Sequence, residues 1–89
     1  DHIKQSDILK DLHKIKHVKD VHHLVIRRKD SATLELSAHL VMSHKCIDAQ
    51  HWNACRLEAE RMLHKKYRFE HCVLQLESED NDNCNHHHD

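Results

Sequence analysis

The sequence predicts an α+β domain of two layers, in which two helices cover one face of a three-stranded sheet. Two observations carry this prediction. Apolar residues recur at helical spacing in residues 6–16 and 48–67, and they alternate or cluster as in β-strands in residues 21–27, 34–42 and 72–77. In chain order these elements read α-β-β-α-β, and no internal repeat interrupts them.

The first helix is expected to begin at Ser6, whose side chain can cap it, with Asp7 in the first turn, where the helix dipole favours an anion. The strand that follows, residues 21–27, is rich in β-branched residues and ends in charge. The next strand has the clearest pattern in the chain. Apolar residues at its even positions, 34–42, alternate with Glu35, Ser37, His39 and Val41, so one face of this strand should be buried.

Asp48 is a plausible cap for the long second helix. The predicted buried stripe of that helix consists of Trp52, Cys55, Ala59, Met62 and Leu63. The third strand should place Cys72 in the core. From Ser78 onward the chain is acidic and polar, so we expect a single domain over residues 1–77 and a flexible acidic Cys/His-rich tail over 78–89.

Length and charge restrict the function classes. A chain of 89 residues buries a modest core, and a dimer partner or a metal would add to its stability. Lys and Arg number 14 against 15 Asp and Glu, which argues against a nucleic-acid-binding module with a basic face. No apolar stretch approaches the ~20 residues that cross a bilayer, so a soluble piece without direct membrane insertion is expected.

Histidine is the anomaly, with 13 of 89 residues. Folding does not require this, whereas the neutral imidazole is the commonest metal ligand. Four cysteines accompany the histidines and, without a visible signal peptide, are expected to be reduced thiols. A Gly-rich phosphate loop and a His-Glu-x-x-His motif are both missing, so catalysis is not expected.

Three segments together resemble a known family: residues 21–24 (Val-His-His-Leu), 36–41 (Leu-Ser-Ala-His-Leu-Val) and 69–77 (Phe-Glu-His-Cys-Val-Leu-Gln-Leu-Glu). In order and spacing they are similar to the C-terminal domain of cation diffusion facilitator transporters, which include bacterial cobalt-zinc-cadmium efflux proteins. The resemblance implies a metallochaperone-like (ferredoxin-like) fold and a cytoplasmic domain that forms a homodimer. It also implies binding of zinc or a related divalent ion and regulation of transport through the transmembrane domain of the same transporter.

The resemblance also implies the candidate ligands. His22, His39 and Glu77 match the family's metal-binding positions on the three strands, and His71 matches a histidine just before the third strand. Cys84 matches a tail cysteine of some members. The family often has a second histidine and a tryptophan on the first strand, where this chain instead has Val25 and Arg27, so it departs from the usual residues of the dimer face.

The residue pattern supports part of this ligand set. His39 and Glu77 both oppose the apolar positions of their strands, so they should share the uncovered face of the sheet, where a third imidazole would complete a zinc site. His22 shares the parity of Leu24 and Ile26, and would have to lie at the start of its strand, where the twist redirects it. The alternative is that these polar residues merely line a solvated face.

The tail is a second candidate for metal binding. Cys84 is followed by three further potential ligands, His86, His87 and His88, in a segment short enough to fold back onto a site. An unstructured polar end and a cloning remnant are the alternatives. Zinc is favoured because nitrogen and thiolate ligands suit it better than magnesium or calcium, with cadmium, cobalt, nickel and manganese as other options.

Three functions remain open at this point. The first is a cytoplasmic regulatory domain of a zinc-type efflux transporter, which dimerises, binds metal and closes to modulate transport. The second is a stand-alone zinc buffer or metallochaperone of the same fold. The third is a structural dimerisation module whose histidines are incidental.

Overall fold

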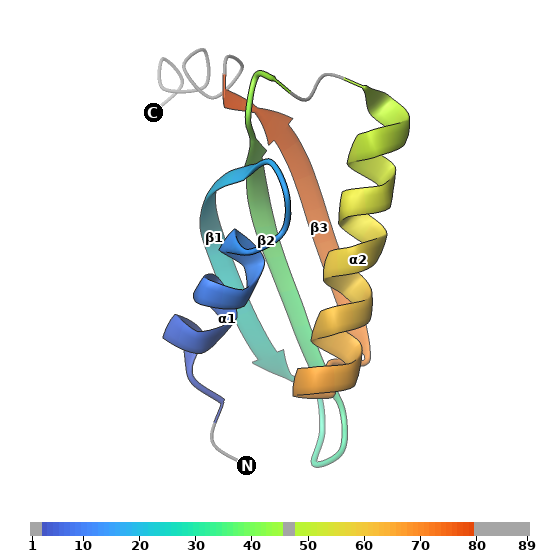
Figure 1. The fold of residues 1–89 in the computed structure, drawn as a ribbon. Coiled ribbons are helices and arrows are strands. Elements are labelled where there is room, and N and C mark those ends of the chain that lie inside the picture. The colour runs from blue at the N-terminus through green and yellow to red at the C-terminus, as the bar shows by residue number, and fades with distance from the viewer. Residues whose placement is uncertain (1–2, 46–47, 80–89) are drawn as a thin grey trace, which may run out of the picture.

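The computed structural model describes residues 3–45 and 48–79, and its elements follow the predicted order (Figure 1). Two helices and three strands make up the described part of the chain: α1 (Gln5–His13), β1 (Val18–Arg28), β2 (Leu34–Met42), α2 (Ala49–Tyr67) and β3 (His71–Ser78). None of the helices in this part is long and apolar enough to cross a membrane.

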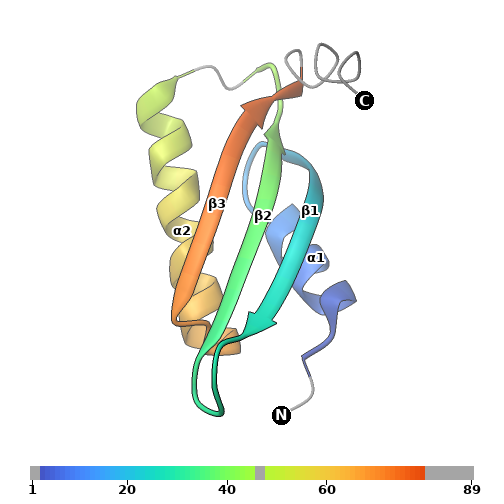
Figure 2. The same ribbon diagram turned by 180° about the vertical axis from the view of Figure 1, so that it is seen from behind.

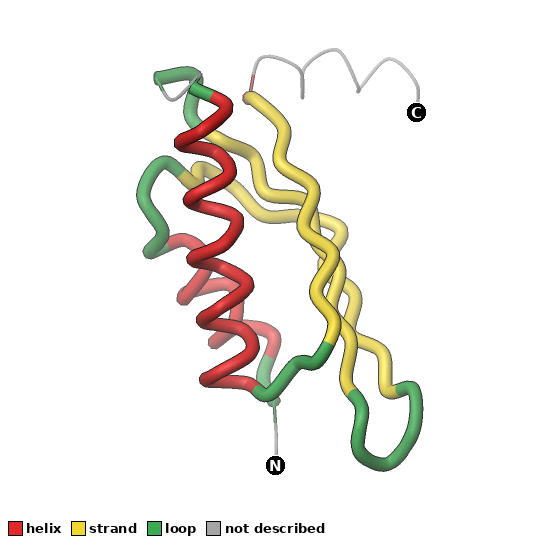
Figure 3. Tube along the Cα trace, turned by 90° about the vertical axis from the view of Figure 1, so that its right-hand side faces the viewer, coloured by secondary structure: helices red, strands yellow, loops and turns green. Residues whose placement is uncertain are grey.

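The strands form one mixed sheet in the order β1-β2-β3. Strands β1 and β2 pair antiparallel through a short hairpin, whereas β2 and β3 run parallel and therefore need a crossover, which α2 provides. Both helices lie on the same face of the sheet (Figures 1 and 3). Viewed from behind, the other face has no described helix over it (Figure 2). The predicted two-layer α+β fold is confirmed.

The core lies between the helices and the sheet. Its fully buried large side chains come from α1, β2, α2 and the segment between α2 and β3: Ile8, Leu12, Leu36, Leu40, Met42, Leu63 and Phe69. Strand β1 adds the buried side chains of Val18 and Val21. On α2, the predicted stripe is buried at Cys55, Ala59 and Leu63, while Trp52 and Met62 pack against the core from half-buried positions. Cys72 is likewise half-buried at the edge of the core.

Helix α1 differs from its prediction at both ends. It begins at Gln5 after Lys4, which makes no side-chain cap hydrogen bond, so the expected cap at Ser6 is wrong. It ends at His13 and not at residue 16, because a turn follows in which the amide of Lys14 donates to the carbonyl of Asp11. Ile15 stays buried in this turn. Helical spacing of apolar residues therefore continued past the helix itself.

Helix α2 is capped at both ends. The Asp48 carboxylate accepts a hydrogen bond from the amide of Gln50, as predicted. At the other end, Arg68 has a left-handed backbone with φ 68°. The amide of Arg68 donates a hydrogen bond to the carbonyl of His64, and the amide of Phe69 donates one to the carbonyl of Leu63. Such left-handed ends usually carry glycine, which this chain lacks entirely.

Strand β1 is interrupted by two irregularities in its pairing with β2. One lies between Val18 and Asp20, the other between His22 and Val25. Each inserts one extra residue into β1, as in a β-bulge, and so reverses which face the next residue occupies. The core-facing residues of β1 are consequently Val18, Val21, Leu24 and Ile26, a spacing that simple alternation does not give.

Candidate metal centre

His22 and His39 lie side by side on the face of the sheet that no described helix covers. They are paired residues in the antiparallel register of β1 and β2. His22 is inside β1, and the second bulge, which follows it, explains its position. Val21 before it and Leu24 after it both face the core, although three residues separate them. The expected placement at the start of the strand is therefore wrong, while the expected face is right.

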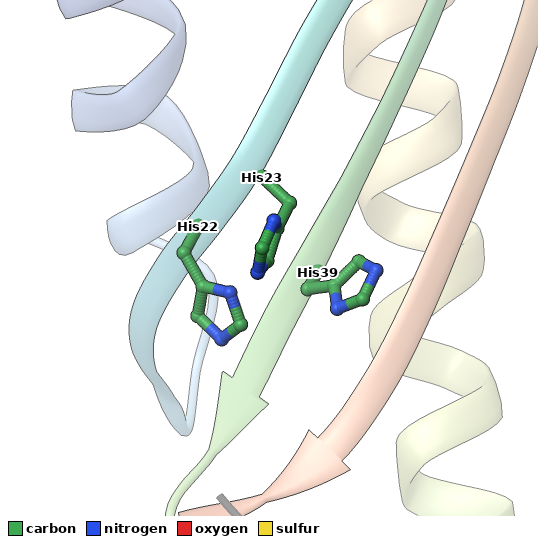
Figure 4. A group of neighbouring side chains, drawn as sticks. All are labelled: His22, His23 and His39. Atoms are coloured by element: carbon green, nitrogen blue, oxygen red, sulfur yellow. The ribbon is translucent and has the colours of Figure 1, made fainter. Parts of the chain in front are cut away.

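His23 joins this pair because its backbone is left-handed. Its φ of 57° is unusual for a residue other than glycine and falls within the bulge. Two consecutive strand residues normally point to opposite faces, but here both imidazoles lie beside His39 (Figure 4). The ring centroids of His23 lie 4.6 Å from His22 and 4.8 Å from His39. One nitrogen from each of the three rings lies within 4.8 Å of the others.

Glu77 brings a carboxylate to the same place from β3. In the parallel register it is the partner of Val41, two residues beyond His39 along β2. Its Oε2 lies 3.2 Å from Nε2 of His22 and 3.2 Å from Nδ1 of His39. The Glu77 side chain is only 11% exposed, whereas those of His22 and His39 are 31% and 34% exposed. The carboxylate therefore lies beneath the two imidazoles, at the base of the group.

These donors suit a zinc-type ion. Ligand bonds of ~2.0–2.1 Å in a tetrahedral shell keep the ligand atoms roughly 3.3 Å apart, close to the carboxylate–imidazole separations observed. The third imidazole, on His23, also has a ring nitrogen within 4.8 Å of those of His22 and His39. Three nitrogens and one oxygen would then fill a four-coordinate shell from one chain. With neutral imidazoles the group carries one negative charge, which a divalent cation reverses.

His23 was not among the residues predicted from the sequence. The spacing of the apolar residues in β1 contains the missing signal, because Val18, Val21 and Leu24 recur every third position. In a strand, such spacing requires an extra residue between each pair. A bulge at His22-His23 follows from that pattern, and it brings adjacent side chains together.

The other predicted ligands lie elsewhere. His71 is the first residue of β3, exposed, and paired in register with Glu35. Six residues separate it from Glu77, or about 20 Å of strand, so the structure does not bring His71 to the group. Cys84, His86, His87 and His88 fall outside the described residues.

Two other potential ligands, His13 and Cys55, have local partners. His13 Nδ1 lies 2.8 Å from the carbonyl of Leu9. Cys55 is buried, and its thiol donates to the carbonyl of Lys16 at 3.5 Å. Among the described residues, the imidazoles of His22, His23 and His39 form the single group of three His, Cys, Asp or Glu side chains spaced to hold a metal ion.

Comparison with known proteins identifies the family of the chain. The family described as "Cation efflux protein, cytoplasmic domain" matches residues 1–79. Among solved structures, the metal-bound C-terminal domain of the CzcD transporter from Cuprividus metallidurans is similar in fold, with a TM-score of 0.73 and 23% sequence identity over 84% of this chain and 99% of that one. No curated protein sequence matches the chain. The family match spans most of the chain, which therefore belongs to the cytoplasmic domains of cation efflux proteins.

Proposed function

We propose that this chain is the metal-sensing regulatory domain of a zinc-type efflux transporter. It binds one divalent ion at His22, His23, His39 and Glu77, forms a homodimer, and closes on metal binding to modulate transport by the transmembrane domain. The observation that carries the proposal is the convergence of three imidazoles and one carboxylate, from three strands, on the uncovered face of the sheet. That the family is one of efflux proteins, and not of enzymes, agrees with a regulatory role.

The surroundings of the site support a dimer. Val25 and Val73 are 41% and 68% exposed, and with Ser37 they line a hollow of about 160 Å³ on the same face of the sheet. Exposed apolar side chains on an otherwise polar face are typical of an interface. We assign this face to the second protomer, so the metal site lies on the same sheet surface as the dimer contact.

Metal binding can change such a dimer through charge. The Glu77 carboxylates of two protomers repel each other across a shared face, and a bound divalent ion replaces that repulsion by a fixed tetrahedral shell. The conformation with ordered ligands is then favoured. Coupling free energies of about 1–3 kcal/mol are typical of such effectors, which is enough to bias an attached domain.

The test is a zinc titration by calorimetry with small-angle scattering on the same samples. The subjects are the chain, a His39→Ala Glu77→Ala variant, and a matched control, His13→Ala Glu58→Ala, whose side chains are exposed and outside the site. We expect saturable binding with a more compact dimer in the wild type and in the control, and neither in the site variant. Affinity should fall at acidic pH, because a metal-bound imidazole must be deprotonated.

Two outcomes would contradict the proposal. Binding that survives in the site variant but disappears when residues 84–89 are deleted would assign the metal to the tail and favour a buffer. Saturable binding without any change in dimer shape would support the metal site but contradict the proposed closure of the dimer.

A further inference from the structure

A cleft of about 790 Å³ is lined by residues of α1, the ends of β1 and β2 at their hairpin, and the end of α2. Figure 1 shows these ends of β1, β2 and α2 in its lower part. Five cationic side chains line it: Lys10, Lys14, Arg28, Lys66 and Arg68. The two carboxylates in the lining are Asp7 and Asp11, which leaves an excess of three positive charges. Because the whole chain has a net charge of −1, this excess is a local concentration of positive charge.

Asp11 is already engaged by neighbours within the cleft. Its Oδ2 lies 2.8 Å from Nζ of Lys66 and accepts a hydrogen bond from the hydroxyl of Tyr67, and its Oδ1 lies 3.5 Å from Nζ of Lys14. Asp11 thus joins α1 to the end of α2 and offsets the charge of the two lysines only in part. This arrangement holds the cationic side chains of both helices around one opening.

The other three cations of the cleft have no carboxylate partner among the residues that the structure describes. Lys10, Arg28 and Arg68 are exposed, and within residues 3–45 and 48–79 none of them forms an ion pair. The polar contact of the Arg28 guanidinium is with the carbonyl of Ser31 at 3.4 Å. These three groups come from α1, the end of β1 and the C-cap of α2, so three separate parts of the chain bring positive charge to the lining of the cleft.

The backbone at Arg68 is a second observation at this cleft. Its left-handed conformation costs a residue with a Cβ roughly 1 kcal/mol relative to glycine. Unfavourable backbone conformations of this kind concentrate at functional sites. Here the conformation sends the chain from α2 into β3 and leaves an arginine side chain at the rim of the cleft.

We propose that this cleft binds the phosphate groups of an organic phosphate. A guanidinium presents a planar set of donors that matches phosphate oxygens, and two guanidinium and three ammonium groups around one opening suit a ligand with more than one negative charge. The volume is that of a small-molecule site. Ile3, Leu34 and Tyr67 supply apolar contact for the rest of the ligand. A soluble phosphate compound and a phospholipid headgroup share this chemistry.

This site is separate from the metal centre and goes beyond the proposed function. Arg28 lies six residues from His22 along β1, or about 20 Å of strand. Most of the cleft lining also belongs to α1 and the end of α2, which lie on one face of the sheet, whereas the imidazoles lie on the other face (Figures 1 and 4). Loss of one site should therefore leave the other intact, so the two proposals fail independently.

The test uses the full chain in metal-free buffer with two probes. Calorimetry with inorganic pyrophosphate measures binding of a soluble phosphate, and co-sedimentation with phosphatidylcholine vesicles, with and without phosphatidylglycerol, measures binding of a headgroup. The cleft variant is Lys10→Gln Arg28→Gln Arg68→Gln. The matched control, Lys16→Gln Lys45→Gln Arg61→Gln, removes the same charge from exposed positions outside the cleft. Arg68→Gly alone keeps a favourable backbone for the turn and removes one cation.

We expect wild type and control to bind at least one probe, with affinity lowered by high salt. The cleft variant should bind at least tenfold more weakly, and Arg68→Gly should bind more weakly than wild type while remaining folded by circular dichroism. Pyrophosphate binding would identify a soluble ligand; binding only to vesicles with phosphatidylglycerol would identify a headgroup. Absence of binding to both probes, or equal loss in the control and cleft variants, would overturn the proposal.

Discussion

One oxygen of Glu77, Oε2, lies 3.2 Å from Nε2 of His22 and 3.2 Å from Nδ1 of His39. The two imidazoles come from neighbouring antiparallel strands, and the carboxylate comes from the parallel strand beyond them. Glu77 therefore links all three strands at one point. It supplies the one negative charge of the group, and its side chain is less exposed than those of His22 and His39.

Replacing Glu77 by glutamine tests the importance of that charge. Glu77→Gln keeps the size of the side chain and one carbonyl oxygen, but removes the charge that attracts a divalent ion. Loss of an outer partner of a metal ligand already costs about 10–100-fold in affinity, so we expect a loss of roughly 100-fold or more for this ligand. Zinc calorimetry measures it. Glu70→Gln, at an exposed position before β3, is the control and should bind as wild type does.

His23 can be tested as a ligand without disturbing the bulge. Asparagine tolerates a left-handed backbone, so His23→Asn should preserve the path of β1 while removing the imidazole. We expect at least tenfold weaker zinc binding with little change in the free energy of unfolding. His17→Asn is a matched control, because His17 also has a left-handed backbone, with φ 72°, outside the group. Equal zinc affinity in the two variants would show that His23 is not a zinc ligand.

The regular elements could be predicted because each of them has one buried face and one exposed face. The spacing of the apolar residues then identifies the element and the face that is buried. In β2 the alternation from Leu34 to Leu40 identified both the core face and the face of His39. In β1 the same argument assigned His22 to the core side, because alternation assumes that no residue is inserted. Two insertions in β1 reverse the faces. The three-residue spacing of Val18, Val21 and Leu24 is their signal in the sequence, and simple alternation overlooks it.

The candidate site could likewise be predicted only in part. His39 and Glu77 follow from alternation, and His22 followed from the family resemblance and not from its own position. His23 was missed because its side-chain direction depends on one left-handed backbone angle. The same limitation applies at Arg68, where a glycine-free chain uses an arginine in a conformation that sequence rules reserve for glycine.

The left-handed backbone at Arg68 makes a prediction about stability. Arg68→Gly removes the steric penalty at a fixed left-handed position and should raise the free energy of unfolding by about 1 kcal/mol. Arg61→Gly is the matched control. Arg61 is exposed inside α2, where glycine lowers stability by about 1 kcal/mol. Urea unfolding followed by circular dichroism should therefore move the two variants in opposite directions, and the same direction in both would refute the argument.

The thiol of Cys72 is predicted to be unreactive in the folded protein. Burial raises the pKa of Cys72 from 9.0 to about 11, and the nearby carboxylate of Glu60 adds to the shift. Since the thiolate is the nucleophile, alkylation by iodoacetamide at mildly alkaline pH should be roughly 100-fold slower than for the same residue in the unfolded chain. Peptide mapping by mass spectrometry, in buffer and in urea, measures both rates. Similar rates in the two conditions would show that the thiol is accessible and ionised.

The contact between α1 and the end of α2 predicts a loss of stability in acid. The hydrogen bond from Lys66 and that from Tyr67 lower the pKa of the Asp11 carboxyl from 3.8 to about 2. A carboxyl with a depressed pKa in the folded state stabilises the protein fully above its unfolded value. That contribution is lost as the pH falls from 3.8 towards 2.

Asp11→Asn is the corresponding variant. It should be less stable than wild type at neutral pH, and the difference in free energy of unfolding should shrink over the acid range given above, because the wild type then protonates Asp11 as well. Lys66→Met removes the largest cause of the shift while retaining the carboxyl, so it should reduce the same pH dependence. Urea unfolding at a series of pH values measures both variants. A difference between Asp11→Asn and wild type that stays constant down to pH 2 would show that Lys66 and Tyr67 do not hold Asp11 in its ionised form.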